Sequence, residues 1–275
     1  RLAVLGYRPA PVQVSYLGYP NTTGLDTVDY RLTDAYADPA GSGECSYTER
    51  LIRLERGFLC YQPPEAAPDI VPPPCLEKGY ITFGSFNYPA KISDEAIESW
   101  ARILEQVPDS RLLLKYRSYS DAETRKFFLQ RFEQHGIMQH RLDFLGLTPS
   151  KEEHLKAYHD VDIALDTFPY NGTTTTCDTL WMGVPVIVLK GGVHAGRVGN
   201  SLLQHVGLHE CIAQSSDNYV DLAVALAFQP ARLEQLRMSM RQRLLDSALC
   251  QPGPFVQTLE ATYRSFWSSW CRRHQ

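Results

Sequence analysis

The sequence predicts an α/β protein whose parallel sheet carries helices on both faces. From residue 76 onward, short apolar runs that suit buried strands alternate with longer segments of helical periodicity. Strands joined by crossover helices in this way form parallel sheets. The chain has 275 residues, which is enough for two medium domains of roughly 100–200 residues each. Its 44% hydrophobic and 21% charged residues are typical of a globular protein.

The first 60 residues predict the smaller part of this fold. The expected elements are the end of a helix at 1–7, strands at 12–17 and 28–33, an irregular stretch at 34–46 and a helix at 47–54. The turn between the two strands, Gly18 to Gly24, contains two glycines and Pro20, which fix an unusual backbone path. Loops at strand ends bind ligands in open α/β folds, so this turn is a candidate ligand contact. A plain turn is the alternative.

A proline-rich segment separates this part from the rest of the chain. Residues 61–74 contain six prolines and few apolar side chains, a composition that cannot form regular structure. We therefore expect a first unit at 1–60, a linker at 61–75 and a second unit at 76–275, with the last helix free to pack back on the first unit.

The second unit alternates strands and helices to the end of the chain. Strands are expected at 80–86, 111–116, 142–145, 161–165 and 186–189, and helices at 93–107, 121–135, 150–158, 197–206, 216–228, 231–245 and 255–270. Ser93 caps the first of these helices, and the run from Ser150 to Glu153 is a capping box. Aromatic residues of the last helix, among them Phe266 and Trp267, fall mostly at helical spacing and are interpreted as packing residues.

The stretch from Val161 to Leu189 organises the unit, because it predicts a strand, a turn, a helix and a strand in succession. The helix starts within the run Thr173 to Thr176, and Gly183 ends it. A helix start presents unpaired N–H groups with partial positive charge, and the hydroxyls add donors at the same point. The pattern indicates a phosphate-binding nest in which Gly172 allows close backbone approach. The alternative is that a threonine merely caps the helix.

Composition argues against several classes of function. A net charge of −4 disfavours broad binding to nucleic acid, and no apolar run is long enough to span a membrane. The seven cysteines are scattered without a C-x-x-C pair, which favours free thiols in a reducing, cytoplasmic setting over disulfides or a zinc site. No signal peptide is recognised, although the chain starts at Arg1 rather than at methionine, so its natural start is left open.

Four stretches together resemble the catalytic region of the O-GlcNAc transferase/SPINDLY family. They are RPAPVQVSYLGYPNTTG (8–24), ITFGSFNYPAKIS (81–93), PSKEEHLKAYHDVDIALDTFPYNGTTTTCDTLWMGVPV (149–186) and HAGRVGNSLL (194–203). The resemblance implies a GT-B glycosyltransferase that follows a tetratricopeptide-repeat superhelix. It implies the tail of the N-terminal Rossmann-like lobe and a complete C-terminal lobe. Family histidines proposed to help catalysis would lie outside this sequence.

The resemblance also implies roles for individual residues. Lys91 matches the catalytic lysine that meets the donor diphosphate, where a fixed ammonium offsets the developing charge. The other implied donor contacts are Tyr88, Thr173, Thr174 and Thr175 at the diphosphate, Pro149, Lys151, His154 and Asp178 at the nucleoside, and Gly18, Pro20, His194 and Arg197 on the sugar or acceptor side. No cofactor and no metal ligand set are expected. Taken singly, Lys91 and His154 fit ordinary surface residues, and His194 and Arg197 fit a helix cap.

The implied reaction is inverting transfer of GlcNAc from UDP-GlcNAc to serine or threonine of proteins. Two positions depart from the usual O-GlcNAc transferase pattern: Tyr88 replaces a glutamine and Thr173 replaces a histidine. The block from Asp166 to Cys177 is closer to SPINDLY, whose members transfer fucose from GDP-fucose, whereas Lys151 and Arg197 favour the O-GlcNAc transferase side. A GDP-fucose protein O-fucosyltransferase, a non-catalytic nucleotide-sugar-binding fragment and a sugar-nucleotide epimerase or hydrolase stay as alternatives.

Overall fold

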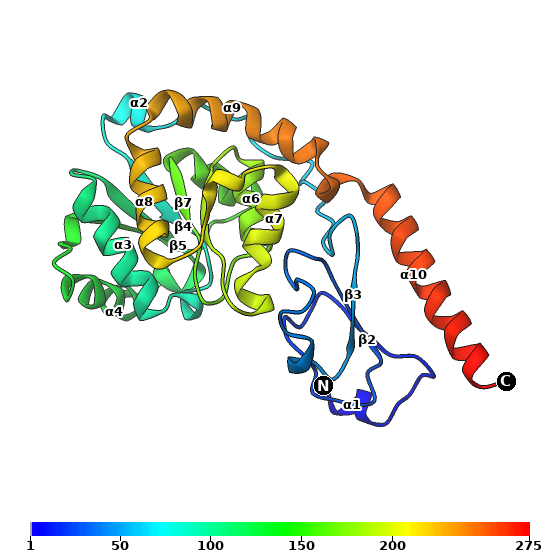
Figure 1. Ribbon diagram of the computed structural model, residues 1–275. Coiled ribbons are helices and arrows are strands. Elements are labelled where there is room, and N and C mark those ends of the chain that lie inside the picture. Colours follow the sequence, from blue (N-terminus) through cyan, green and yellow to red (C-terminus); the bar gives the residue numbers. More distant parts are fainter. Residues whose placement is uncertain (1) are drawn as a thin grey trace.

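The computed structural model describes residues 2–275 and contains two parallel sheets (Figure 1). The smaller sheet has the order β1-β2-β3 and is built from β1 (Val14–Ser15), β2 (Tyr30–Thr33) and β3 (Arg50–Arg53). A single helical turn, α1 (Ala3–Gly6), precedes it. Arg1, the first residue of the expected helix end, lies outside the described residues.

The helix expected at 47–54 is wrong, because β3 occupies this segment. Arg50 to Arg53 pairs in parallel register with Tyr30 to Thr33 of β2. The four residues contain the β-branched Ile52 and lie beside a fully buried strand, so pairing with β2 overrides the local helical pattern.

The larger sheet has six parallel strands in the order β6-β5-β4-β7-β8-β9. Its strands are β4 (Thr82–Ser85), β5 (Arg111–Lys115), β6 (Leu142–Leu145), β7 (Ile163–Leu165), β8 (Val186–Leu189) and β9 (Ile212–Ala213). The first five fall within the segments that the sequence predicted. The two-residue β9 is too short to leave a periodic pattern and was not predicted.

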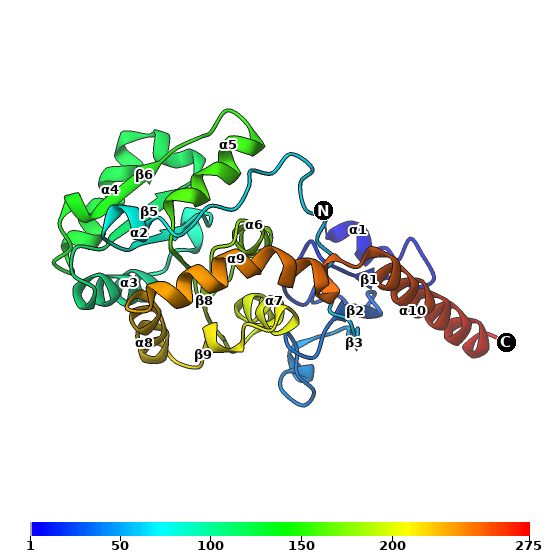
Figure 2. The ribbon, with the colours of Figure 1, turned by 90° about the horizontal axis from the view of Figure 1, so that it is seen from above.

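Helices cover this sheet in the pattern that the alternation predicts (Figures 1 and 2). They are α2 (Cys75–Lys78), α3 (Asp94–Gln106), α4 (Ala122–Glu133), α5 (Lys151–Lys156), α6 (Thr174–Trp181), α7 (Val198–Val206), α8 (Ser216–Ala227) and α9 (Pro230–Asp246). Two predicted caps are confirmed, since the Ser93 hydroxyl accepts from Ala96 N and the Ser150 hydroxyl accepts from Glu153 N. None of the helices in the described chain combines the length and apolar character needed to cross a bilayer.

The last helix, α10 (Pro252–Arg273), leaves the larger unit and runs beside the smaller sheet (Figures 1 and 2). Phe266 stacks on Tyr30 of β2, with ring centroids 3.8 Å apart, and Phe255 is buried in the same cluster. The packing interpretation is therefore confirmed for these two aromatic residues. It is wrong for Tyr263 and Trp267, which are 41% and 52% exposed, because α10 contacts the sheet along one narrow face only.

Candidate active site

The order of the larger sheet places a crevice between β4 and β7. From β4 the chain continues to β5 and β6 on one side, whereas β7, β8 and β9 extend on the other. Ligands of open α/β sheets bind outside the carboxyl ends of the strands at such a switch point. Asn87 follows β4 and Asp166 follows β7, so these two polar side chains mark the floor of the crevice.

The start of α6 forms the wall of this crevice and has free donors. Thr173 is the N-cap residue, but its side chain makes no capping hydrogen bond. Within residues 2–275, the N–H groups and the hydroxyls of Thr173, Thr174 and Thr175 have no hydrogen-bond acceptor. The simple capping alternative is therefore wrong for this helix. Unpaired amides at the positive end of a helix dipole form a site suited to an anion.

Gly172 lets the backbone pass close to the crevice floor. A Cβ added there would lie 2.7 Å from Asn87 Oδ1, 2.7 Å from Thr176 Oγ1 and 3.1 Å from Asp166 Oδ1. These contacts are shorter than van der Waals packing allows, so only glycine fits this path without movement of its neighbours.

Lys91 reaches the same place from the other side of the crevice. It ends a short 3₁₀ turn, Pro89–Lys91, and its Nζ donates to the carbonyl of Asn171 at 2.8 Å. The ammonium lies 3.7 Å from the ring centroid of Tyr170. Burial lowers the pKa of Lys91, and the charge of Asp166 opposes this shift. The structure thus brings Lys91 beside the loop that opens α6.

Asp166 is a residue of this site that the sequence analysis missed. Its Oδ1 accepts from Gly172 N at 2.8 Å, Thr167 N at 2.9 Å and Asn87 Nδ2 at 3.0 Å. Burial raises the pKa of this carboxyl group to about 6. The available signal was its place directly after a buried strand.

A second polar cluster lies one turn further along α6. The buried Asp178 accepts from Tyr61 Oη at 2.8 Å and from Lys151 Nζ, and His154 Nε2 lies 3.8 Å from its Oδ2. The structure therefore brings Lys151, His154 and Asp178 together, and it adds Tyr61 of the linker. Burial, followed by the charges of Lys115 and Lys151, lowers the pKa of His154 to about 4.

Two further predicted residues lie at the rim of the larger unit. Pro149 is exposed on the loop that leads into α5. Tyr88 is also exposed, and its ring lies 5.1 Å from that of Tyr116. The Tyr88 hydroxyl forms no hydrogen bond with the α6 nest in the described chain.

A cavity of about 290 Å³ lies between the two units. Its lining comprises Leu17, Leu59, Cys60, Tyr61, Thr173, Thr174 and Cys177. The turn that carries Gly18 and Pro20 therefore begins beside the nest. The buried Arg31 fixes this turn, because its guanidinium donates to the carbonyls of Tyr19 and Asn21 at 2.7 Å each.

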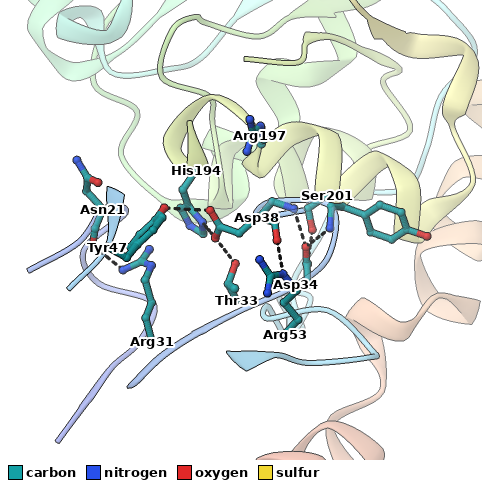
Figure 3. Close-up of polar contacts among 12 residues, drawn as sticks. Asn21, Arg31, Thr33, Asp34, Asp38, Tyr47, Arg53, His194, Arg197 and Ser201 are labelled. Atoms are coloured by element: carbon teal, nitrogen blue, oxygen red, sulfur yellow. Dashed lines mark hydrogen bonds and ion pairs between the residues drawn. The ribbon is translucent and has the colours of Figure 1, made fainter. Parts of the chain in front are cut away.

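His194 and Arg197 lie at the seam between the units (Figure 3). His194 is buried, and its Nδ1 lies 2.7 Å from Asp38 Oδ2. Arg197 points away from this carboxylate and donates to the carbonyls of Gly191 and Gly192. Asp34 accepts from Ser201 at 2.5 Å along the same seam. Asp34, Asp38, His194 and Ser201 therefore connect the two units along this seam.

The seam adjoins the nest through the backbone. Ala195 follows His194, and its carbonyl accepts from Asn171 N at 2.9 Å. Asn171 in turn holds Lys91. His194 thus supports the loop beneath the nest, and its side chain is not presented to the crevice. No group of three or more histidine, cysteine, aspartate or glutamate side chains in residues 2–275 is arranged to hold a metal ion.

The fold and the nest define the class of protein: two parallel α/β units with an uncapped helix start facing the space between them, as in the GT-B fold of glycosyltransferases. A sucrose-phosphate synthase from Thermosynechococcus elongatus has this fold at a TM-score of 0.57 and 16% identity, over 88% of this chain and 59% of its own. A Thermobaculum terrenum O-GlcNAc transferase mutant is far more similar, with a TM-score of 0.93 and 38% identity, over 100% of this chain and 52% of its own.

The chain belongs to glycosyl transferase family 41, whose model matches residues 1–63 and 75–259. A Petunia hybrida protein named probable UDP-N-acetylglucosamine–peptide N-acetylglucosaminyltransferase SPINDLY is 48% identical over 272 residues, 98% of this chain. The Arabidopsis thaliana protein with the same enzyme name and the designation SEC is 31% identical over 285 residues. The chain spans 29% of the length of each of these two relatives.

Proposed function

We propose that this chain is the donor-binding catalytic part of an inverting protein O-glycosyltransferase that transfers GlcNAc from UDP-GlcNAc to serine or threonine. The main support for this proposal is the start of α6, where free amides and hydroxyls lie close to the Lys91 ammonium. Membership of family 41 and the names of the relatives support the same activity.

In the proposed reaction, the oxygen of the acceptor hydroxyl bonds to the anomeric carbon of the sugar. The bond from this carbon to the diphosphate oxygen breaks, and the electron pair leaves with the nucleoside diphosphate. The proton of the acceptor hydroxyl passes to the departing diphosphate or to solvent. Thr173, Thr174 and Thr175 donate hydrogen bonds to the phosphates, and Lys91 balances the charge that develops on the leaving group. Tyr88 closes the outer side of the diphosphate. The nest and the lysine are fixed before the reaction, so little reorganisation is required.

The nucleoside lies, in this proposal, over the second polar cluster. Asp178 accepts from the ribose hydroxyls, with Lys151 beside it, and His154 with Pro149 faces the base. The Asp178 carboxylate already accepts from Tyr61 and Lys151, and its remaining lone pairs are available to the ribose. Tyr61 therefore becomes a neighbour of the nucleoside.

The sugar and acceptor lie toward the smaller unit. Gly18 and Pro20 form the turn beside the sugar, and the cavity next to Leu17 gives this group room. Arg197 lies on the acceptor side, and His194 acts through the loop that it supports. We assign residues 1–60 to the N-terminal lobe, 61–75 to the linker and 76–275 to the C-terminal lobe.

We also propose that the parent protein carries a tetratricopeptide-repeat region and acts on protein acceptors in the cytoplasm. All seven cysteines are free thiols in the structure, which suits a reducing compartment.

The test is sugar transfer by the full-length protein that contains this chain. Radiolabelled UDP-GlcNAc is expected to label serine or threonine of an acceptor protein, with inversion at the anomeric carbon. Absence of transfer to every acceptor, together with tight nucleotide binding, would favour a non-catalytic binding protein. Conversion of UDP-GlcNAc without an acceptor would favour an epimerase or hydrolase.

A GDP-fucose protein O-fucosyltransferase is the second candidate. It is favoured by the greater identity to the SPINDLY relative, 48% against 31% for SEC, and by the threonine run that resembles SPINDLY. Calorimetric titration with UDP and GDP separates the candidates, because each donor leaves its own nucleotide. Tight binding of GDP without binding of UDP would overturn the first choice.

A further inference from the structure

Lys115 is a buried cation without an anionic partner. It ends β5, is only 5% exposed and forms no ion pair with any carboxylate in residues 2–275. Its Nζ lies 2.7 Å from His154 Nδ1 and 3.4 Å from Thr148 Oγ1. Its position at the carboxyl end of a strand places it on the ligand-binding edge of the sheet.

A buried ammonium is costly unless its charge and its hydrogen-bond donors are satisfied. Burial lowers the pKa of Lys115, and the nearby charge of Lys151 lowers it further. Lys151 is paired with Asp178, whereas the two hydrogen-bonding partners of Lys115 are neutral, and its Nζ lies 5.7 Å from the ring centroid of Phe86. An ammonium has three donors, so at least one N–H of Lys115 is left for another acceptor.

The contact with Lys115 also fixes the state of His154. The pKa of about 4 leaves this imidazole neutral at pH 7. Its Nδ1 accepts from the ammonium, so the ring proton is on Nε2. Nε2 lies 3.8 Å from Asp178 Oδ2, too far for a hydrogen bond. Lys115, Lys151 and His154 therefore present donors, and the neighbouring Asp178 carboxylate already accepts from Tyr61 and Lys151.

We infer that Lys115 selects nucleotides whose base carries a carbonyl oxygen at pyrimidine position 4 or purine position 6. The inference rests on the proposed function, which places the nucleoside over this cluster. A carbonyl oxygen accepts the unused N–H of Lys115 and relieves the buried charge. An amino group at the same position is itself a donor and leaves Lys115 unsatisfied. The site thus accepts uracil or guanine and rejects cytosine and adenine.

The test uses two matched pairs of nucleotides that differ in the group at this position and in the hydrogen on the adjacent ring nitrogen. Dissociation constants of UDP and CDP, and of IDP and ADP, are measured by calorimetry on the 275-residue chain. Hydrogen bonds to charged groups contribute about 1.5–3 kcal/mol. In the pair whose base fits the site, the nucleotide with the carbonyl group is therefore expected to bind at least about tenfold more tightly than the one with the amino group. This measurement on the unmodified chain needs no variant.

The variant Lys115→Met keeps the length of the side chain and removes its charge and donors. The oxo-to-amino ratio is expected to fall to about one, while the melting temperature stays at or above that of the parent chain. Lys156→Met is the matched control, because Lys156 is exposed on α5, and it is expected to keep the full ratio.

The outcomes distinguish a failure of the role of Lys115 from a failure of the nucleotide site. Equal affinities within both pairs for the unmodified chain, or an unchanged ratio in a folded Lys115→Met variant, would overturn the role of Lys115 while leaving the nucleotide site in place. No binding of any of the four nucleotides to the unmodified chain would overturn the nucleotide site itself, and the inference with it.

Discussion

The helices α3 and α6 begin with residues of the same chemical kind and use them in opposite ways. At α3, the Ser93 hydroxyl accepts from Ala96 N and donates to the carbonyl of Phe168, so the helix start is satisfied within the protein. At α6, Thr173 makes no cap, and the donors of the first turn stay free. A capped start stabilises the fold, whereas an uncapped start at a switch point is available to a ligand.

Lys91→Ala is the strongest way to test the α6 side of this comparison. The turnover of the full-length enzyme is expected to fall about 10²–10³-fold, the usual loss when one preorganised partner of a developing charge is removed. The melting temperature is expected to stay unchanged, because Lys91 is only half-buried. Lys126→Ala, on the exposed face of α4, is the control that keeps full turnover. Unaltered turnover in Lys91→Ala would remove this residue from the mechanism.

Asp166→Asn tests the buried charge beneath the α6 start through the pH dependence of stability. Burial raises the pKa of Asp166 to about 6, above an unfolded value of about 3.9, so the folded chain holds its proton more tightly. Stability from this group is therefore present below pH 4 and is lost as the pH rises through 6. The loss is about 1–3 kcal/mol.

Urea denaturation at pH 4.5 and pH 7.5 measures this effect. The parent chain is expected to show the larger decrease in unfolding free energy between these two values, and Asp166→Asn the smaller one. An identical pH dependence of the two proteins would contradict the assignment of the raised pKa to Asp166.

Gly172→Ala tests the close approach that opens the nest. The added methyl group would meet Asn87, Thr176 and Asp166, so these groups must move. Overpacking of this kind costs about 1–3 kcal/mol, and the displaced loop is expected to weaken nucleotide binding as well. Gly253→Ala is a matched control, because a Cβ at that position meets no atom within 4 Å. Retained nucleotide affinity in Gly172→Ala would show that nucleotide binding does not need the close backbone approach at residue 172.

The variants Thr173→Val and Ser93→Ala compare the starts of α6 and α3 directly, and their expected effects are the smallest. Ser93→Ala removes a cap and is expected to cost about 1 kcal/mol of stability with unchanged nucleotide affinity. Thr173→Val removes a hydroxyl without a partner, so we expect unchanged stability and weaker diphosphate binding. Denaturation and calorimetry on both variants measure the two quantities, and a loss of stability in Thr173→Val would show that Thr173 caps the helix.

The larger unit was predictable because its signals are local. Ser93, Ser150 and the run from Thr173 each mark a helix start within four residues of sequence. The segment 47–54 was assigned incorrectly because β3 exists through its pairing with β2, which lies some twenty residues away. Strand identity in such short segments depends on the neighbour more than on composition.

The site residues also divide into those that the sequence indicated and those that only the folded structure brings out. Turn and helix signals indicated the nest, and the family resemblance pointed to Lys91, both of which the structure brings together. Lys115 and Tyr61 could not be singled out, because their partners lie far along the chain, such as Asp178 for Tyr61. Asp166 was missed although it directly follows a buried strand, because burial and the bond from Asn87 appear only in the fold. His194 was assigned toward the sugar or acceptor, and its burial against Asp38 follows from the docking of two units that the sequence does not specify.

The path of the chain crosses between the two units twice, once through residues 61–74 and again where α10 departs after α9 and stacks Phe266 on Tyr30. With a single connection, one unit could rotate in any direction relative to the other. Two connections restrict that rotation mainly to the axis that joins them.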